Sequence, residues 1–215
     1  MAQLGISKPA ISRLCLIYRF LDEMIREGVQ TVSSSQIAER LSINSHNVRK
    51  DINYLGDVGN LGAGYDVLKL RMAIAQKFNF HQPRNSCVVG LGRLGSAILN
   101  FDKFQEHGFK IVAGFDSNIN KIETMRSSVA LYPSHMISDI VRRFDIQLGV
   151  IAVPEEMAQK VTDQLVDGGI KGIINLTPVV LKPKDNKVFV RNLSILGDFH
   201  YLSALIALHQ EEAEN

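Results

Sequence analysis

A glycine-rich hexapeptide constrains the fold of this chain more than any other feature of its 215 residues. It runs from Gly90 to Gly95, directly after the apolar segment 87–89 and at the start of a segment expected to be a helix. A strand, a glycine turn and a helix in this order are typical of a βαβ unit that binds a dinucleotide. An acidic residue, Asp116, lies 21 positions after the last glycine, at the end of a second apolar segment. These residues together predict the first half of a Rossmann domain.

Each glycine of the motif has a physical reason. Gly90 permits a tight turn, Gly92 lets the backbone approach a pyrophosphate, and Gly95 allows the helix to pack closely on the sheet. The start of the helix then offers free N–H groups and a positive dipole to the phosphates. Asp116 can accept hydrogen bonds from a ribose 2′-hydroxyl and would repel a 2′-phosphate, and the next two residues are not basic. The motif therefore predicts NAD(H) rather than NADP(H); the alternative is a glycine turn that only packs a helix on a sheet.

The rest of the C-terminal part alternates between apolar segments and helical patterns, which predicts a parallel sheet with helices on both faces. Strands are expected at 87–89, 110–116, 129–132, 146–153, 170–176 and 188–190, and helices at 90–104, up to 144, and at 154–168. A final helix, about 194–212, is apolar on one side.

The first eighty residues follow a different pattern, in which apolar residues recur every three or four positions. This spacing between Ile11 and Ile25 predicts an amphipathic helix that Gly28 is placed to end. Ser33 and Gln36 fit a capping box at the start of a second, short helix. After a turn at 42–44, a third helix is expected, with an apolar stripe on one side and polar and basic residues on the other.

Two short helices joined by a tight turn, the second of them polar, are typical of a helix-turn-helix. Ser45 is expected to be the N-cap of the second of these helices. Four glycines between positions 56 and 64 predict a hairpin or wing, and a helix at 67–77 and a linker at 79–85 follow. The candidate DNA-binding residues are Ser45, His46, Asn47, Arg49 and Lys50.

Composition adds weaker evidence. Residues 1–80 contain ten Lys and Arg against seven Asp and Glu, and the remainder contains fourteen against fifteen. The net positive charge therefore lies in the part of the chain that is predicted to bind DNA. No apolar run reaches the roughly 18–20 residues of a membrane span, and no signal-peptide pattern is present, which predicts a cytoplasmic protein without a membrane partner. Cys15 and Cys87 lack Cys or His partners at metal spacing, so we expect buried structural thiols and no metal site.

The same sequence argues against an enzyme. A dehydrogenase needs a substrate pocket and an acid or base beside the nicotinamide, but only about forty residues follow the fifth expected strand. We interpret His107, His135, His200 and His209 as surface or packing residues and Glu155-Glu156 as favourable charge at a helix start. The alternative from another class is a small NAD-dependent oxidoreductase with a partner-binding N-terminal domain.

Short segments throughout the chain are informative when they are taken together. They are Ala10–Leu14, Val32–Ser34, Val48–Asp51, the glycine-rich run ending at Gly64-Tyr65, Gly90–Ser96, Phe115-Asp116, Ala152–Pro154, Gly169–Asn175, Pro178-Val179 and Val190–Asn192. With them, the chain resembles the Rex family of bacterial redox-sensing repressors along nearly its full length. The resemblance implies an α/β protein with a winged helix-turn-helix at 1–80, a doubly wound Rossmann sheet at 85–192, and a C-terminal helix at 193–215 that is swapped between the subunits of a homodimer.

The resemblance also implies a function, that of an NADH/NAD⁺-responsive transcriptional repressor. Such a homodimer binds operator double-stranded DNA and is released by NADH, whereas NAD⁺ competes without releasing it. Arg49 and Lys50 match DNA-contacting positions of the recognition helix. The residues that match the dinucleotide site are Gly90, Leu91, Gly92, Arg93, Leu94, Gly95 and Asp116, with Val153, Pro154, Asn175 and Pro178 in segments close to the nicotinamide.

Three positions, in two features of the family, depart from the family pattern. The family wing usually carries an arginine between two glycines, where this chain has Leu61, and the loss of a cation there should weaken DNA binding. Family members also couple an arginine of the first helix to a tyrosine and an aspartate. Arg19 is present, but the other positions are Phe101 and Ser194, with Asp198 one helical turn later as a candidate substitute. A divergent relative that binds NAD(H) but contacts a protein, or DNA only weakly, is therefore a second alternative.

Overall fold

The structure is a computed structural model that describes residues 5–56, 58 and 64–214, with side chains described up to residue 210. The chain forms two compact units, Met1–Gln82 and Pro83–Asn215, so their boundary lies within the predicted linker. Leu61, at the predicted wing, lies outside the described residues.

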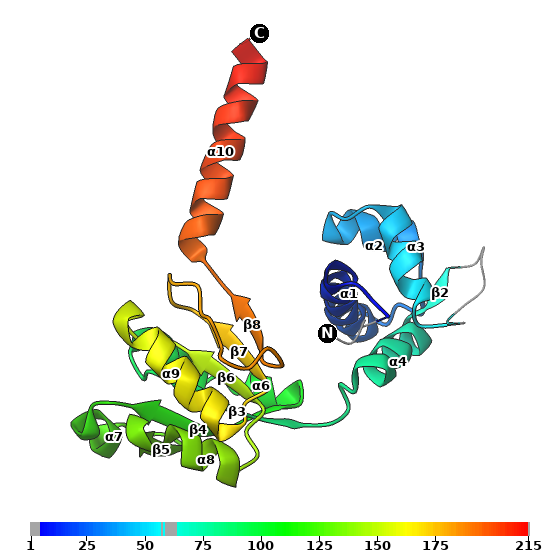
Figure 1. Cartoon of the computed structure of the whole chain (residues 1–215). Helices are drawn as coiled ribbons and strands as arrows, with labels where there is room; N and C mark the ends of the chain where they lie inside the picture. The colour runs from blue at the N-terminus through cyan, green and yellow to red at the C-terminus, as the bar shows by residue number, and fades with distance from the viewer. Residues whose placement is uncertain (1–4, 57, 59–63, 215) are drawn as a thin grey trace. The chain divides into compact units, whose positions relative to one another are not determined.

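The N-terminal unit combines helices with one short antiparallel pair of strands (Figure 1). Its elements are α1 (Lys8–Arg26), β1 (Thr31–Val32), α2 (Ser34–Leu41), α3 (Ser45–Asn53), β2 (Tyr65–Asp66) and α4 (Val67–Phe78). The predicted capping box is present, since Gln36 N donates to Ser33 Oγ at 3.1 Å and Ser33 N donates to Gln36 Oε1 at 2.8 Å. Strand β1 pairs antiparallel with β2, which follows α2 and α3 in the chain. Most of the predicted hairpin or wing, at residues 57 and 59–63, lies outside the described residues.

The cap of the third helix differs from the prediction by one residue. The N-cap is Asn44, whose Oδ1 accepts a hydrogen bond from His46 N at 2.8 Å, and Ser45 is the first helical residue. Both residue types cap helices, and the asparagine side chain reaches an N–H group two residues ahead. Helix α3 packs through Val48 and Ile52 onto a core that includes Leu14 of α1 and Ile37 of α2.

An ion pair between buried Asp51 and half-buried Arg13 also joins α3 to α1. Asp51 is 1% exposed and accepts hydrogen bonds from Arg13 Nε at 2.6 Å and Arg13 Nη2 at 3.0 Å. The two parallel bonds fix the geometry of the guanidinium against the carboxylate. Asp51 thus orients the helix that carries the candidate DNA-binding residues.

The C-terminal unit contains a six-stranded parallel sheet in the order β5-β4-β3-β6-β7-β8. Its strands are β3 (Arg84–Val89), β4 (Phe109–Asp116), β5 (Ala130–Pro133), β6 (Leu148–Ile151), β7 (Gly172–Asn175) and β8 (Phe189–Asn192). Its helices are α5 (Arg93–Leu99), α6 (Lys103–Glu106), α7 (Ile119–Thr124), the 3₁₀ turn η1 (Ser134–Met136), α8 (Ile137–Arg143), α9 (Glu155–Gly168) and α10 (Ile195–Glu214).

Successive residues of β3 point into two separate cores. Cys87 and Val89 pack with α8 and α9 on one face, while Val88 packs with Leu91 and with Leu99 of α5 on the other. A sheet with helices on both faces is doubly wound, as predicted. The strand order reverses between β3 and β6, and this is the position at which such folds bind ligands.

Several boundaries differ from the predicted ones. The helix after the glycine motif ends at Leu99 rather than continuing to 104, because the Asn100 side chain donates to Ser96 O at 2.9 Å in its last turn, and α6 follows as a separate helix. Strand β3 begins at Arg84 within the predicted linker, since the backbone of these polar residues pairs with β4. Helix α7 was not predicted because it is short and has no buried residue.

Candidate functional site

The first and third glycines of the motif are required by close packing. Gly90 has φ +91°, and a Cβ there would lie 2.4 Å from the carbonyl oxygen of Ala152. A Cβ on Gly95 would lie 1.8 Å from the carbonyl oxygen of Gly90. A Cβ on Gly92, in contrast, would meet no atom within 4 Å, and the residue faces a cavity. The loop therefore holds α5 against β3 through its outer glycines and leaves its middle glycine open to a ligand.

Asp116 ends β4 beside this loop and is 8% exposed. Its Oδ2 accepts hydrogen bonds from Leu91 N at 2.8 Å and Lys121 Nζ at 2.9 Å, and its Oδ1 accepts one from Asn118 N at 2.9 Å. A carboxylate has about four acceptor positions, so one on Oδ1 remains for a ribose hydroxyl. Burial alone would raise the pKa of the Asp116 carboxyl, but the three donors outweigh it and hold the pKa below its ordinary value.

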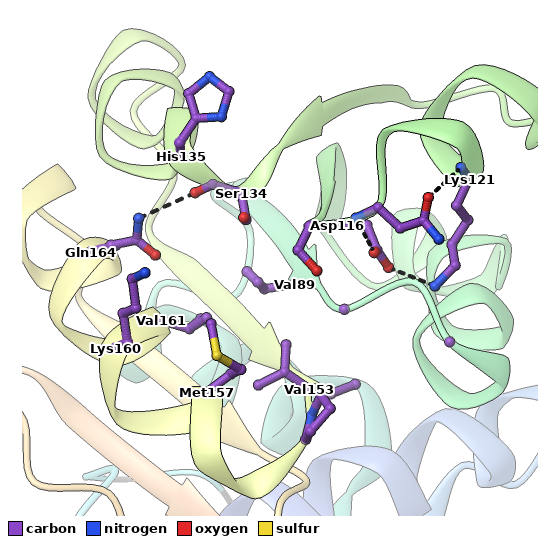
Figure 2. A pocket seen from close by; sticks show the side chains of 16 residues that line it. Val89, Asp116, Lys121, Ser134, His135, Val153, Met157, Lys160, Val161 and Gln164 are labelled. Carbon is purple, nitrogen blue, oxygen red and sulfur yellow. Dashed lines mark hydrogen bonds and ion pairs between the residues drawn. The ribbon is translucent and has the colours of Figure 1, made fainter.

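A cavity of about 400 Å³ opens at the carboxyl ends of β3, β4 and β6, within the volume range typical of ligand pockets. In Figure 2, Asp116 and Lys121 lie on the right, Ser134, Lys160, Val161 and Gln164 on the left, and Met157 and Val153 along the lower edge. The Gln164 side chain donates to Ser134 O at 3.3 Å and closes the far wall. The lining residues are Val89, Gly90, Gly92, Asp116, Ser117, Asn118, Lys121, Ser134, His135, Ala152, Val153, Pro154, Met157, Lys160, Val161 and Gln164.

The predicted dinucleotide residues do not all line this cavity. Gly90, Gly92, Asp116, Val153 and Pro154 do so. Leu91 and Gly95 are buried behind the loop, Arg93 and Leu94 are exposed in the first turn of α5, and Asn175 and Pro178 lie at the end of β7. The cavity thus lies over the carboxyl ends of β3, β4 and β6, and the two predicted residues at the end of β7 lie outside its lining.

Sequence reasoning missed one whole wall of the cavity. Met157, Lys160, Val161 and Gln164 form one face of α9, and their spacing of three and four residues after a strand was the available signal. His135 was interpreted as a surface residue, and although its side chain is exposed, it also lines the cavity.

Lys121 is a second omission, and it alters the charge of the site. The residues immediately after Asp116 are not basic, but the first turns of α7 bring Lys121 back onto the carboxylate. The local charge is therefore that of an ion pair rather than of an isolated carboxylate. Because Lys121 neutralises the charge of Asp116, the site suits a ribose diol mainly through the free acceptor position on Asp116 Oδ1.

The candidate DNA-binding residues lie on α3. His46, Arg49 and Lys50 are exposed, whereas Ser45 and Asn47 are half-buried. Arg49 Nη1 donates to Ser34 Oγ in the first turn of α2 at 3.1 Å. Two exposed cations on the polar second helix of a helix-turn-helix suit contact with DNA.

The four predicted switch residues lie in different places. Arg19 is exposed on α1 of the N-terminal unit, and the other three belong to the C-terminal unit. Phe101 is 50% exposed and contacts Phe104 edge to face with ring centres 5.1 Å apart. Ser194 Oγ accepts a hydrogen bond from Gly197 N at 3.0 Å, so it caps α10, and Asp198 lies in the first turn of that helix.

Other kinds of site find no support in the described part of the chain. Burial raises the pKa of the Cys87 thiol to about 12 and also raises that of half-buried Cys15, so neither forms a thiolate at neutral pH. Residues 5–56, 58 and 64–214 contain no cluster of three or more possible metal ligands. No helix in the same residues is long and apolar enough to cross a membrane.

Comparisons with known proteins agree with this division of the chain. Residues 5–53 match the family described as "Putative DNA-binding protein N-terminus", and residues 81–179 match the family described as "CoA binding domain". A helix-turn-helix unit joined to a Rossmann unit with an open dinucleotide cradle defines a class, the ligand-responsive DNA-binding proteins.

Relatives along the whole length identify the family. The redox-sensing transcriptional repressor Rex of Pelotomaculum thermopropionicum is 34% identical over 99% of this chain and 100% of its own length. Rex of Carboxydothermus hydrogenoformans is 37% identical over 92% of this chain and 95% of its own length. The chain belongs to the family of Rex redox-sensing transcriptional repressors.

Solved structures of a family member show the same fold. RSP in complex with β-NAD⁺ and operator DNA is 27% identical, with a TM-score of 0.87 over 97% of this chain and 96% of that one. RSP in complex with β-NADH is 26% identical, with a TM-score of 0.86 over 97% and 98% of the two chains.

Proposed function

We propose that this protein is an NADH/NAD⁺-responsive transcriptional repressor that binds operator DNA and is released by NADH. The observation that carries the proposal is the joining, in one chain, of the Gly90–Asp116 cradle to a helix-turn-helix with Arg49 and Lys50 exposed. The complexes of RSP with NAD⁺ and operator DNA and with NADH support both ligands. The place of action is the cytoplasm, where DNA and the dinucleotide pool meet.

The proposed unit of binding is a homodimer. The described part of α10 exposes large apolar side chains in the single chain, among them Leu196, Phe199, Leu202 and Ile206, and apolar surface of this extent is typical of an interaction site. Two recognition helices related by symmetry would match two half-sites of an operator. Sedimentation of the full chain and of a chain ending at residue 193 tests this, and a full chain that remains monomeric would contradict it.

Sensing requires that NADH and NAD⁺ favour different arrangements of the dimer. Both forms share the phosphates and riboses, so only the nicotinamide end can distinguish them. A tenfold preference corresponds to about 1.4 kcal/mol per site. The proposed role is that of a sensor and not of an enzyme, so no turnover is expected in a hydride-transfer assay.

The deciding experiment uses a DNA duplex selected from a random library by the dinucleotide-free protein. Fluorescence anisotropy of this duplex is then titrated with NADH and with NAD⁺. We expect NADH to release the DNA at concentrations at which NAD⁺ does not. Equal responses to the two forms, or no selected DNA, would reject the proposal.

One observation keeps a second function open, that of a divergent relative with weak or absent DNA binding. The family wing carries an arginine at the place of Leu61, and each lost cation removes a phosphate contact. If the wing limits DNA binding, Leu61→Arg should tighten binding to the selected duplex and steepen its salt dependence by about one unit. Tight binding by the unaltered chain, unchanged by Leu61→Arg, would exclude this alternative.

A further inference from the structure

The buried amide of Asn175 uses all of its hydrogen-bonding capacity within the chain. Its Nδ2 donates to Val179 O at 2.7 Å and to Asn192 Oδ1 at 2.9 Å. Its Oδ1 accepts from Thr177 N at 3.0 Å and Thr177 Oγ1 at 2.8 Å. An asparagine amide has two N–H donors and an oxygen with two lone pairs, so no capacity remains for a dinucleotide. Asn175 therefore bonds only to other parts of the chain, although the family resemblance implies a place for it close to the nicotinamide.

On one side, Asn175 holds the segment that leads into α10. It pairs in register with Asn192, the last residue of β8, and its carbonyl oxygen accepts a hydrogen bond from Leu193 N at 2.9 Å. Ser194 follows and caps α10 through Gly197 N. The side chain and the backbone of one buried residue thus bond to both residues that directly precede this cap.

On the other side, Asn175 shapes the turn at 176–178. Thr177, only 5% exposed, is bound to its amide twice. Leu176 N donates to the carbonyl oxygen of Ile151, the last residue of β6, at 3.0 Å, and the next two residues of the chain after Ile151 line the cavity. A dinucleotide that crosses the sheet between β3 and β6 extends its nicotinamide half over the carboxyl ends of β6 and β7, which is where this turn lies.

We propose that Asn175 is a positioning residue that transmits the state of the nicotinamide end to the start of α10 through Asn192. This inference rests on the proposed function, because it needs a dinucleotide whose nicotinamide half lies against the turn at 176–178. The oxidised ring is cationic and planar and the reduced ring is neutral, so the two differ in how they fit a turn. A displacement of the turn must either move the Asn175 amide or break its bonds to Thr177. Asn192 and Leu193 both form hydrogen bonds with Asn175, so a movement of Asn175 also displaces the start of α10.

The test uses Asn192, which is exposed, so that its replacement leaves the core intact. Asn192→Ala removes the acceptor for Asn175 Nδ2, and Asn192→Asp keeps an oxygen at that position as the matched control. Hydrogen exchange is measured on the full chain with and without NADH, at residues 90–96 and at residues 193–200. Release of the selected duplex by NADH is measured in parallel.

In the unaltered chain and in Asn192→Asp, we expect NADH to change the exchange of both segments. In Asn192→Ala, residues 90–96 should still respond at the same NADH concentration, while the response of residues 193–200 is reduced to what the Leu193 N hydrogen bond to Asn175 can still transmit. Loss of one hydrogen bond of this kind should raise the NADH concentration needed for release by roughly three- to tenfold.

Three results separate the possibilities. If Asn192→Ala keeps the full NADH response at residues 193–200, the proposed transmission is wrong. If Asn192→Ala no longer binds NADH at residues 90–96, Asn192 serves the fold or the ligand directly and the proposal also fails. If NADH alters residues 193–200 through Asn192 but releases no DNA, the transmission stands and the proposed function is the part that fails.

Discussion

Each unit buries one aspartate among the residues that the structure describes, and the partners of the two carboxylates differ. Asp51 is held by two nitrogens of Arg13 from a neighbouring helix. Asp116 is held by two backbone N–H groups and by Lys121, whose side chain is 38% exposed. The Arg13 guanidinium sets the angle between two helices, whereas backbone donors and an exposed cation leave an acceptor position open. A buried carboxylate is thus structural in the DNA-binding unit and available to a ligand in the Rossmann unit.

The largest expected effect comes from removing the partner of Asp51. Arg13→Ala leaves an unpaired carboxylate that is 1% exposed, and such a loss costs about 3–5 kcal/mol. We expect amide exchange in α1 and α3 to accelerate accordingly, while exchange in β3 and β4 stays unchanged. The double variant Arg13→Met with Asp51→Leu is the control, because it removes both charges and should recover most of the stability. If Arg13→Ala lowers the free energy of unfolding by less than about 1 kcal/mol, as loss of an exposed ion pair does, Asp51 does not have the structural role that separates it from Asp116.

Asp116→Ala should act on binding instead. Loss of hydrogen bonds to a charged acceptor weakens binding by about 1.5–3 kcal/mol, which is roughly tenfold to more than a hundredfold. Because NADH and NAD⁺ share the adenosine ribose, calorimetric titration should show the same loss for both. Asp139→Ala, at an exposed carboxylate of α8, should change neither affinity. A variant that alters the ratio of the two affinities would show that Asp116 also acts at the nicotinamide end.

Arg49→Ala tests whether the surface of α3 can be separated from the ion pair beneath it. Arg49 is exposed two residues before Asp51, so the helix should remain folded without it. We expect operator affinity to fall by about 1–3 kcal/mol for a base contact, or the salt dependence to decrease by about one unit for a phosphate contact. Arg142→Ala, at an exposed arginine of the other unit, should leave both quantities unchanged. Faster amide exchange in α3 of Arg49→Ala would mean that Arg49 also stabilises this helix.

The two aspartates also explain what could be predicted from the sequence. Asp116 was found because the dinucleotide motif places an acid at a regular distance, and the glycines, helix caps and strand alternation are local signals of the same kind. The partnership of Asp51 with Arg13 spans 38 positions and leaves no local pattern. Lys121 was missed for a related reason, since its helix buries no residue and shows no periodicity. Periodicity in the sequence cannot predict contacts between residues that only the tertiary fold brings together.

The smallest effect is expected at Lys121 and concerns pH. Lys121→Met removes a partly exposed ion pair worth about 0–1 kcal/mol, so NADH affinity at neutral pH should change by less than about fivefold. Its hydrogen bond helps to lower the pKa of Asp116, and without it that pKa should rise. The ionised carboxylate accepts hydrogen bonds from a ribose more strongly than the protonated acid does, so binding weakens as the pH drops through this pKa. The acid limb of NAD⁺ binding, measured by calorimetry, should therefore move to higher pH in the variant. An acid limb at the same pH would mean that the two backbone donors alone keep the pKa of Asp116 low. Lys121 would then not be needed to keep this carboxylate ionised for a ligand.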